Sequence, residues 1–220
     1  MMEGAGPSNP QGAIRIPKPS KYRLMINSRA KLAEFRARHN IPADVTLREL
    51  PVGQTPVATE AEIPIPVVAI VEGGVNFPLD RIFRKFLYMA DLCTHQVSIN
   101  TMRVVLGFSA LNRLLGLDLG LPEILYCYAL GRNRDYSRFY LKARATDRAL
   151  LLGLPDTDKD ANDYLMVGGN FEFPAEDDRK YGVPRVAGRP GPPLFIFCPF
   201  LCQLYLCHAF LLTLFISCCS

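Results

Sequence analysis

The stretch from residue 100 to residue 116 reads NTMRVVLGFSALNRLLG, and its pattern indicates a helical centre for the fold. Its apolar residues recur at spacings of three, four and seven, which is the pattern of one face of an α-helix packed on a core. Asn100 can cap the first turn, and Gly116 can adopt the left-handed conformation that commonly ends a helix. We therefore expect a core helix here. Its apolar face consists of Val104, Val105, Phe108, Leu111, Leu114 and Leu115.

Upstream of this helix, the sequence predicts a buried strand and a second helix. The β-branched run at 67–71 (VVAIV) ends at Gly73 and Gly74, which indicates a buried strand followed by a turn. Asp80 is a helix cap, and the helix after it carries an apolar face. That face comprises Ile82, Phe83, Phe86 and Leu87.

Downstream, Pro122 marks the first position of a third helix, and a polar turn at 131–137 leads into a strand at 138–144. Further short strands are expected at 150–154 and 164–167. This order predicts an α+β domain over residues 65–175, with a three-helix cluster and a small antiparallel sheet. Its core should include Ile70, Phe83, Phe86, Val105, Phe108, Leu111, Leu125, Leu141 and Val167.

The segments on either side of the domain differ from it in composition. Residues 1–20 are rich in Gly, Pro and Ser and are expected to be disordered, and 21–64 read as a basic helix followed by a Pro-rich linker. Ser28 can cap that helix, which Pro42 should end. Residues 176–193 read as a polar Pro/Gly linker.

The net charge of +4 is concentrated at the N-terminal end, where residues 1–40 hold eight basic and two acidic residues. Such asymmetry indicates contact with an anionic partner, and nucleic acid is one candidate. A solvated basic arm with no partner is the alternative. The residues that would contact nucleic acid are Lys21, Arg23, Arg29, Lys31, Arg36 and Arg38.

Residues 194–216 contain no charged residue, and they include seven leucines and five phenylalanines. At ~1.5 Å per residue a helix of this length spans a bilayer core of ~30 Å. The sequence thus predicts an apolar C-terminal helix that crosses a membrane once, with the preceding domain cytoplasmic. Alternatively, the tail is read-through of a T-rich non-coding stretch, which would leave the domain nuclear or cytoplasmic.

Three features resemble reactive or metal sites but lack the required residues or the required spacing. Asp156, Asp158 and Asp160 have calcium-loop spacing, but the required Gly and the bidentate Glu are absent from the sixth and twelfth positions. Cys93 and His95 lie only two residues apart, and the tail cysteines match no zinc-finger pattern. We therefore expect no enzymatic activity, no cofactor and no metal.

Several short motifs in fixed order resemble the plant gypsy-type transposon domain, a family derived from transposable elements. They are FPLD at 77–80, HQVSIN at 95–100, RVVLGF at 103–108, YLKAR at 140–144, GLPD at 153–156 and GGNFE at 168–172. The upstream YRLMINS at 22–28 resembles the leader of some members. The resemblance implies no catalytic residues. It implies a gag-like module that self-associates or binds a protein partner, with nucleic-acid binding as the alternative function.

Overall fold

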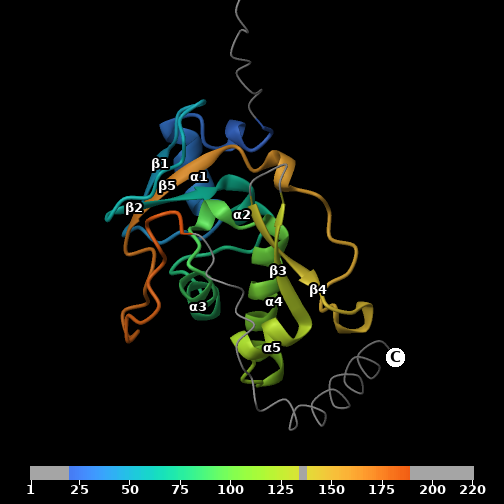
Figure 1. The fold of residues 1–220 in the computed structure, drawn as a ribbon. Helices are drawn as coiled ribbons and strands as arrows, with labels where there is room; N and C mark the ends of the chain where they lie inside the picture. The colour runs from blue at the N-terminus through green and yellow to red at the C-terminus, as the bar shows by residue number, and fades with distance from the viewer. Residues whose placement is uncertain (1–19, 134–137, 189–220) are drawn as a thin grey trace, which may run out of the picture.

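The computed structural model describes residues 20–133 and 138–188, and it contains a three-stranded antiparallel sheet, which lies at the upper left in Figure 1. The strand order is β1-β5-β2, so the last strand in the sequence lies between the first two. In register, Val167 of β5 faces Leu47 of β1 on one side and Ile63 of β2 on the other. The strands are β1 (Val45–Glu49), β2 (Glu62–Pro66) and β5 (Tyr164–Gly169).

The end of β5 requires glycine at two successive positions. Gly169 has a φ of +72°, and a Cβ there would lie 2.2 Å from the carbonyl oxygen of Asp44. A Cβ on Gly168 would lie 2.7 Å from the side-chain oxygen of Thr46. Only glycine therefore lets β1 approach the end of β5 this closely.

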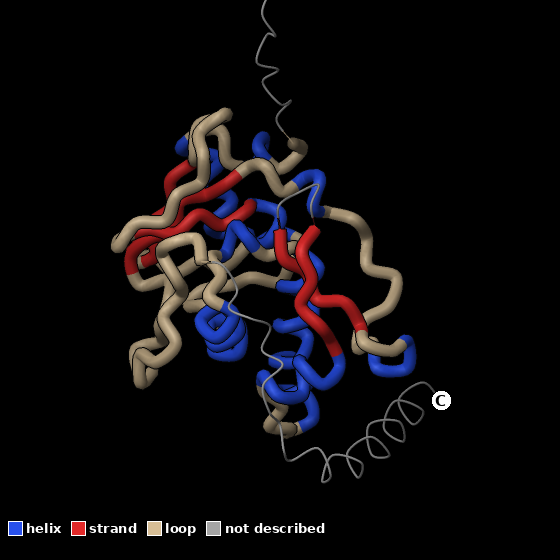
Figure 2. The backbone as a smooth tube through the Cα atoms, viewed as in Figure 1, coloured by secondary structure: helices blue, strands red, loops and turns tan. Residues whose placement is uncertain are grey.

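A second sheet is the hairpin of β3 (Tyr128–Asn133) and β4 (Arg138–Ala143). Its β4 edge is covered by the chain that enters the long helix α4. The backbone N–H of Ser98 donates to the Phe139 carbonyl at 2.8 Å, and the N–H of Leu141 donates to the Thr101 hydroxyl at 2.8 Å. The hairpin is thereby attached to the start of α4 (Figure 2).

Helices α2 and α4 lie between the two sheets, since α2 contacts β2 and α4, and α4 contacts β4. Helix α3 packs on both α4 and α5. Short 3-10 turns connect these elements. The α-helices are α1 (Arg29–Arg38), α2 (Val67–Val71), α3 (Arg81–Ala90), α4 (Ile99–Leu115) and α5 (Leu121–Cys127), and the 3-10 turns are η1 (Arg23–Met25), η2 (Thr94–Gln96), η3 (Thr146–Arg148) and η4 (Asp158–Asp160).

Several predicted helix ends are confirmed. Asp80 caps α3 by accepting from the N–H of Ile82 at 2.9 Å, and Gly116 ends α4 in the left-handed region. The cap of α4 is Ser98 rather than Asn100, because the Ser98 side chain accepts from the N–H of Thr101. The predicted mixture of helices with small antiparallel sheets is the observed α+β architecture.

Two predicted strands are wrong. Residues 67–71 form the buried helix α2, since a short uniformly apolar run fits a buried helix as well as a buried strand. The observed strand is β2, which lies just before α2. It is at the edge of the sheet, where Pro64 and Pro66 are tolerated. Residues 150–154 form no strand, because the backbone N–H groups of Leu150 and Leu151 bond the Tyr128 hydroxyl instead of a neighbouring strand.

The predicted boundary between residues 64 and 65 does not separate two packed units. Tyr22, Phe35 and Val45 belong to the same buried core as the central helices. The N–H of Ser20 donates to the Asp163 carboxylate at 3.0 Å, which fastens the start of this segment to the sheet. The basic helix and β1 are thus part of the domain, because their apolar residues complete its core.

Most of the predicted core is buried. Six residues are at most 6% exposed, whereas Leu111, Leu125 and Leu141 are only partly buried at its edge. The six are Ile70, Phe83, Phe86, Val105, Phe108 and Val167.

Part of the predicted linker 176–193 is held to the domain by a buried arginine. Arg84 of α3 is fully buried and pairs with Asp177, and its Nη1 donates to the Lys180 carbonyl at 3.0 Å. Nearby, Arg185 donates to Glu172 at 2.6 Å. Up to residue 188, the described part of this segment therefore packs against the domain.

The prediction of a single-pass membrane protein is corrected by the structure. Within residues 20–133 and 138–188, no helix combines the length and apolar character needed to cross a bilayer. The longest, α4, has 17 residues and carries Arg103 and Arg113. The predicted apolar helix at 194–216 and the predicted disordered residues 1–19 lie outside the described residues.

Candidate interaction surface

Of the three aspartates with calcium-loop spacing, Asp158 supports the fold. Asp158 accepts from the backbone N–H of Ile99 at 2.9 Å, at the first turn of α4, and lies 3.8 Å from Arg138. Arg138 is itself 5% exposed and donates to the carbonyl of Asp158. Across the two described ranges, no group of three or more His, Cys, Asp or Glu side chains could hold a metal ion.

Cys93 and His95 have separate environments. The Cys93 thiol is 1% exposed and donates to the Pro184 carbonyl at 3.1 Å. Burial raises the pKa of this thiol to about 11, which opposes the thiolate form that a nucleophile needs. Burial lowers the pKa of His95, with a smaller contribution from the Arg138 charge.

Two of the six predicted nucleic-acid-binding residues are used inside the domain. Arg23 pairs with Glu49 at 2.5 Å and with Asp163 at 3.6 Å, and its side chain is only 19% exposed. Arg36 donates to the carbonyl oxygens of Pro42 and Val45 and so holds the turn between α1 and β1. The guanidinium groups of both arginines therefore already have ion-pair or hydrogen-bond partners within the protein.

The other four basic residues reach the surface, three of them with an acidic partner. Lys21 is 3.3 Å from Glu72, and Lys31 and Arg38 each lie 2.8 Å from Glu34. Arg29 is exposed at the start of α1. Two glutamates offset only part of these four positive charges, which reduces but does not cancel the attraction that a phosphate backbone would feel here.

The same region contains a shallow hollow of about 110 Å³ between η1 and α1. Phe35 forms the apolar floor, and Lys31, Glu34 and Arg38 lie one turn apart along the rim. Leu24 belongs to the lining but is 65% exposed. We call this surface the η1–α1 face; its residues are Leu24, Met25, Lys31, Glu34, Phe35 and Arg38.

Local sequence explains the geometry of this face. Tyr22 and Ile26 point into the core, so the 3-10 turn between them exposes Leu24. Ser28 then starts α1, with its side chain accepting from the N–H of Lys31 at 3.2 Å. From the sequence, this region is predicted only as a basic helix. The signal missing from that prediction is a leucine that is exposed between two buried apolar residues.

Comparison with known proteins found no match among protein-family models, curated proteins or solved structures. The resemblance to the plant gypsy-type transposon domain therefore stays a prediction from the motifs.

Proposed function

We propose that this chain is a non-enzymatic protein-interaction module that pairs with a second copy of itself through the η1–α1 face. The observation that carries the proposal is the exposed Leu24 beside a hollow of about 110 Å³. An apolar cavity of ~150 Å³ accommodates benzene, so this hollow suits roughly one aliphatic side chain. Leu24 of each copy is such a side chain, available to the hollow of the other.

The rim charges make the same face self-complementary. Along α1 they run positive, negative, positive, at Lys31, Glu34 and Arg38. In a twofold interface each residue that contacts a partner residue is contacted by it in return. Glu34 of one copy can therefore meet Arg38 of the other, twice per dimer. Such pairing adds specificity to the apolar contact of Leu24.

The resemblance to a retroelement-derived family supports the proposal, because it implies a gag-like module that self-associates. Nucleic-acid binding is the second candidate, and the exposure of Arg29, Lys31 and Arg38 on α1 is the observation in its favour. We rank it lower because Arg23 and Arg36 are occupied by internal contacts.

Sedimentation equilibrium of the full chain tests the proposal. Leu24→Asp places a charge in the apolar contact and should weaken self-association by tenfold or more. Leu114→Asp is the matched control, since Leu114 is 80% exposed at the end of α4 and lies outside the η1–α1 face. Residues 194–216 are identical in both variants, so the difference between them reports on the face alone. Equal association of the two variants would overturn the proposal.

A titration with duplex DNA and single-stranded RNA addresses the second candidate. Phosphate contacts make the affinity fall steeply between ~50 and ~200 mM salt. Undetectable binding at the lower salt would remove the nucleic-acid function. Salt-dependent binding that Arg29→Ala weakens would support it.

A further inference from the structure

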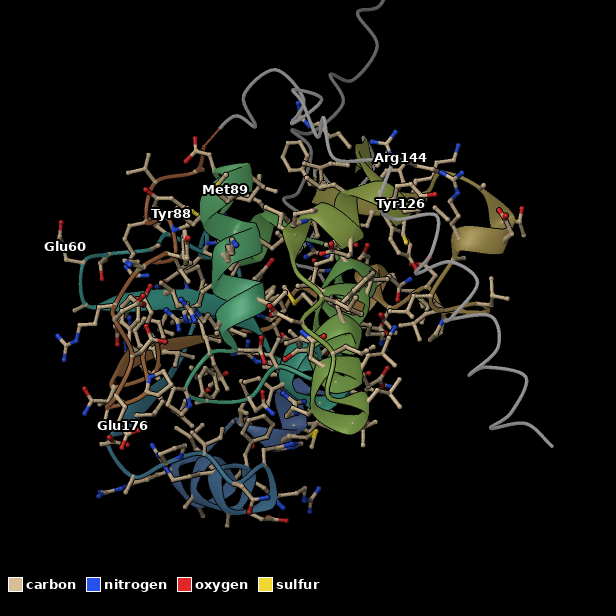
Figure 3. The ribbon with its side chains drawn as sticks, turned by 90° about the horizontal axis from the view of Figure 1, so that it is seen from below. Glu60, Tyr88, Met89, Tyr126, Arg144 and Glu176 are labelled. Carbon is tan, nitrogen blue, oxygen red and sulfur yellow. The ribbon has the colours of Figure 1, made fainter. Side chains whose placement is uncertain are left out.

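A second apolar patch lies at the C-terminal end of α3, away from the η1–α1 face. Tyr88 is 53% exposed and Met89 is 42% exposed, although most other apolar residues of this helix are buried. Figure 3 shows both side chains at the end of α3. Val186 is 80% exposed in the chain that runs beside this end. We call Tyr88, Met89 and Val186 the α3-end patch.

The chain from residue 181 to residue 188 is fixed along the same end of α3. The rings of Tyr181 and Tyr88 pack edge to face, with centroids 5.6 Å apart. Gly188 lies against the backbone of Asp91, since a Cβ at 188 would be 2.1 Å from the Asp91 carbonyl oxygen. The Gln96 side chain also donates to the Gly188 carbonyl at 3.2 Å. The described chain therefore ends next to the α3-end patch.

We propose that the α3-end patch is the docking site for this chain's own apolar segment, residues 194–216, which lies outside the described residues. Only five residues separate Gly188 from Leu194. Six residue steps of extended chain span at most about 20 Å, so the segment begins within that distance of Gly188. The anchored position of Gly188 determines which surface it reaches first.

The chemistry of the segment supports this occupant. Residues 194–216 hold seven leucines, five phenylalanines and no charged residue, so transfer of their side chains out of water is favourable. Tyr88, Met89 and Val186 offer apolar area of the matching kind. Because the segment is part of the same chain, its effective concentration at the patch is high.

Hydroxyl-radical footprinting tests the docking on the full chain and on a version that stops after Gly188. Both can be made by cell-free translation and labelled at nanomolar concentration, where contacts between copies are disfavoured. Labelling of Tyr88 and Met89 should be several-fold slower in the full chain, and labelling of Leu114 should be unchanged. Equal rates at Tyr88 and Met89 in the two versions would overturn the proposal.

Thiol labelling supplies a second readout that does not depend on the truncated chain. Cys198, Cys202 and Cys207 lie in the apolar segment and should react slowly with a maleimide. Met89→Lys should raise their reaction rate several-fold, and the matched Leu114→Lys should leave it unchanged. Equal rates in both variants, or protection that disappears on tenfold dilution, would show that the patch does not hold its own segment.

Discussion

Replacing Asp177 by alanine should lower the free energy of unfolding by roughly 3–5 kcal/mol, because it leaves a buried charge without its partner. The partner is Arg84, whose side chain is fully buried, while that of Asp177 is 9% exposed. The guanidinium group also donates to the Leu79 carbonyl at 3.2 Å and lies 4.5 Å from the ring centre of Phe173. These neighbours hold Arg84 in place but supply no negative charge.

The neighbouring aspartate provides a matched control. Asp178 is 39% exposed and lies 3.4 Å from Arg81, in an ion pair that solvent screens. Asp178→Ala should therefore have a small effect, as is usual for exposed pairs. Urea unfolding followed by far-UV circular dichroism measures both variants. If Asp177→Ala shifts the midpoint no further than Asp178→Ala does, the buried pair is not the attachment that we describe.

Three further predictions concern local features. Ser28→Ala removes the cap of α1 and should cost ~1 kcal/mol of unfolding free energy, measured by urea denaturation. Hydrogen bonding from Tyr22 lowers the pKa of Glu72 below its ordinary 4.5. The stability that this carboxylate contributes is therefore complete above pH 4.5 and is lost as the pH falls further. Glu72→Gln should reduce this loss of stability, measured by acid titration. Gly169→Ala should lower the melting temperature by several degrees, since alanine is strained at positive φ and its Cβ would meet Asp44.

The long, strongly patterned elements of the fold could be predicted from the sequence. The apolar spacing in α3 and α4, with Asp80 and Gly116 at their ends, depends on local physics that a single helix already contains. Strands β1, β2 and β3 were not predicted. Each has five or six residues, and β2 contains two prolines, so the assignment of β2 depends on its pairing with β5, which begins at residue 164.

The candidate surface could be located from the sequence only in part. The basic residues around 21–38 indicated the right region and a helix capped by Ser28. Sequence spacing could not show that Arg23 is neutralised by Glu49 and Asp163, because those partners are distant along the chain. The same tertiary contacts determine that Leu24 faces solvent. This is why a predicted phosphate-binding arm becomes a candidate protein interface.

A charge-swap experiment on the full chain tests the proposed twofold pairing most directly. Glu34→Arg and Arg38→Glu each place like charges against one another across the interface, so each variant alone should sediment as a monomer. Mixed in equal amounts, the two variants restore opposite charges at both contacts, and a heterodimer should form at the concentration where wild type dimerises. A mixture that stays monomeric, or single variants that dimerise as well as wild type does, would contradict self-association through the η1–α1 face.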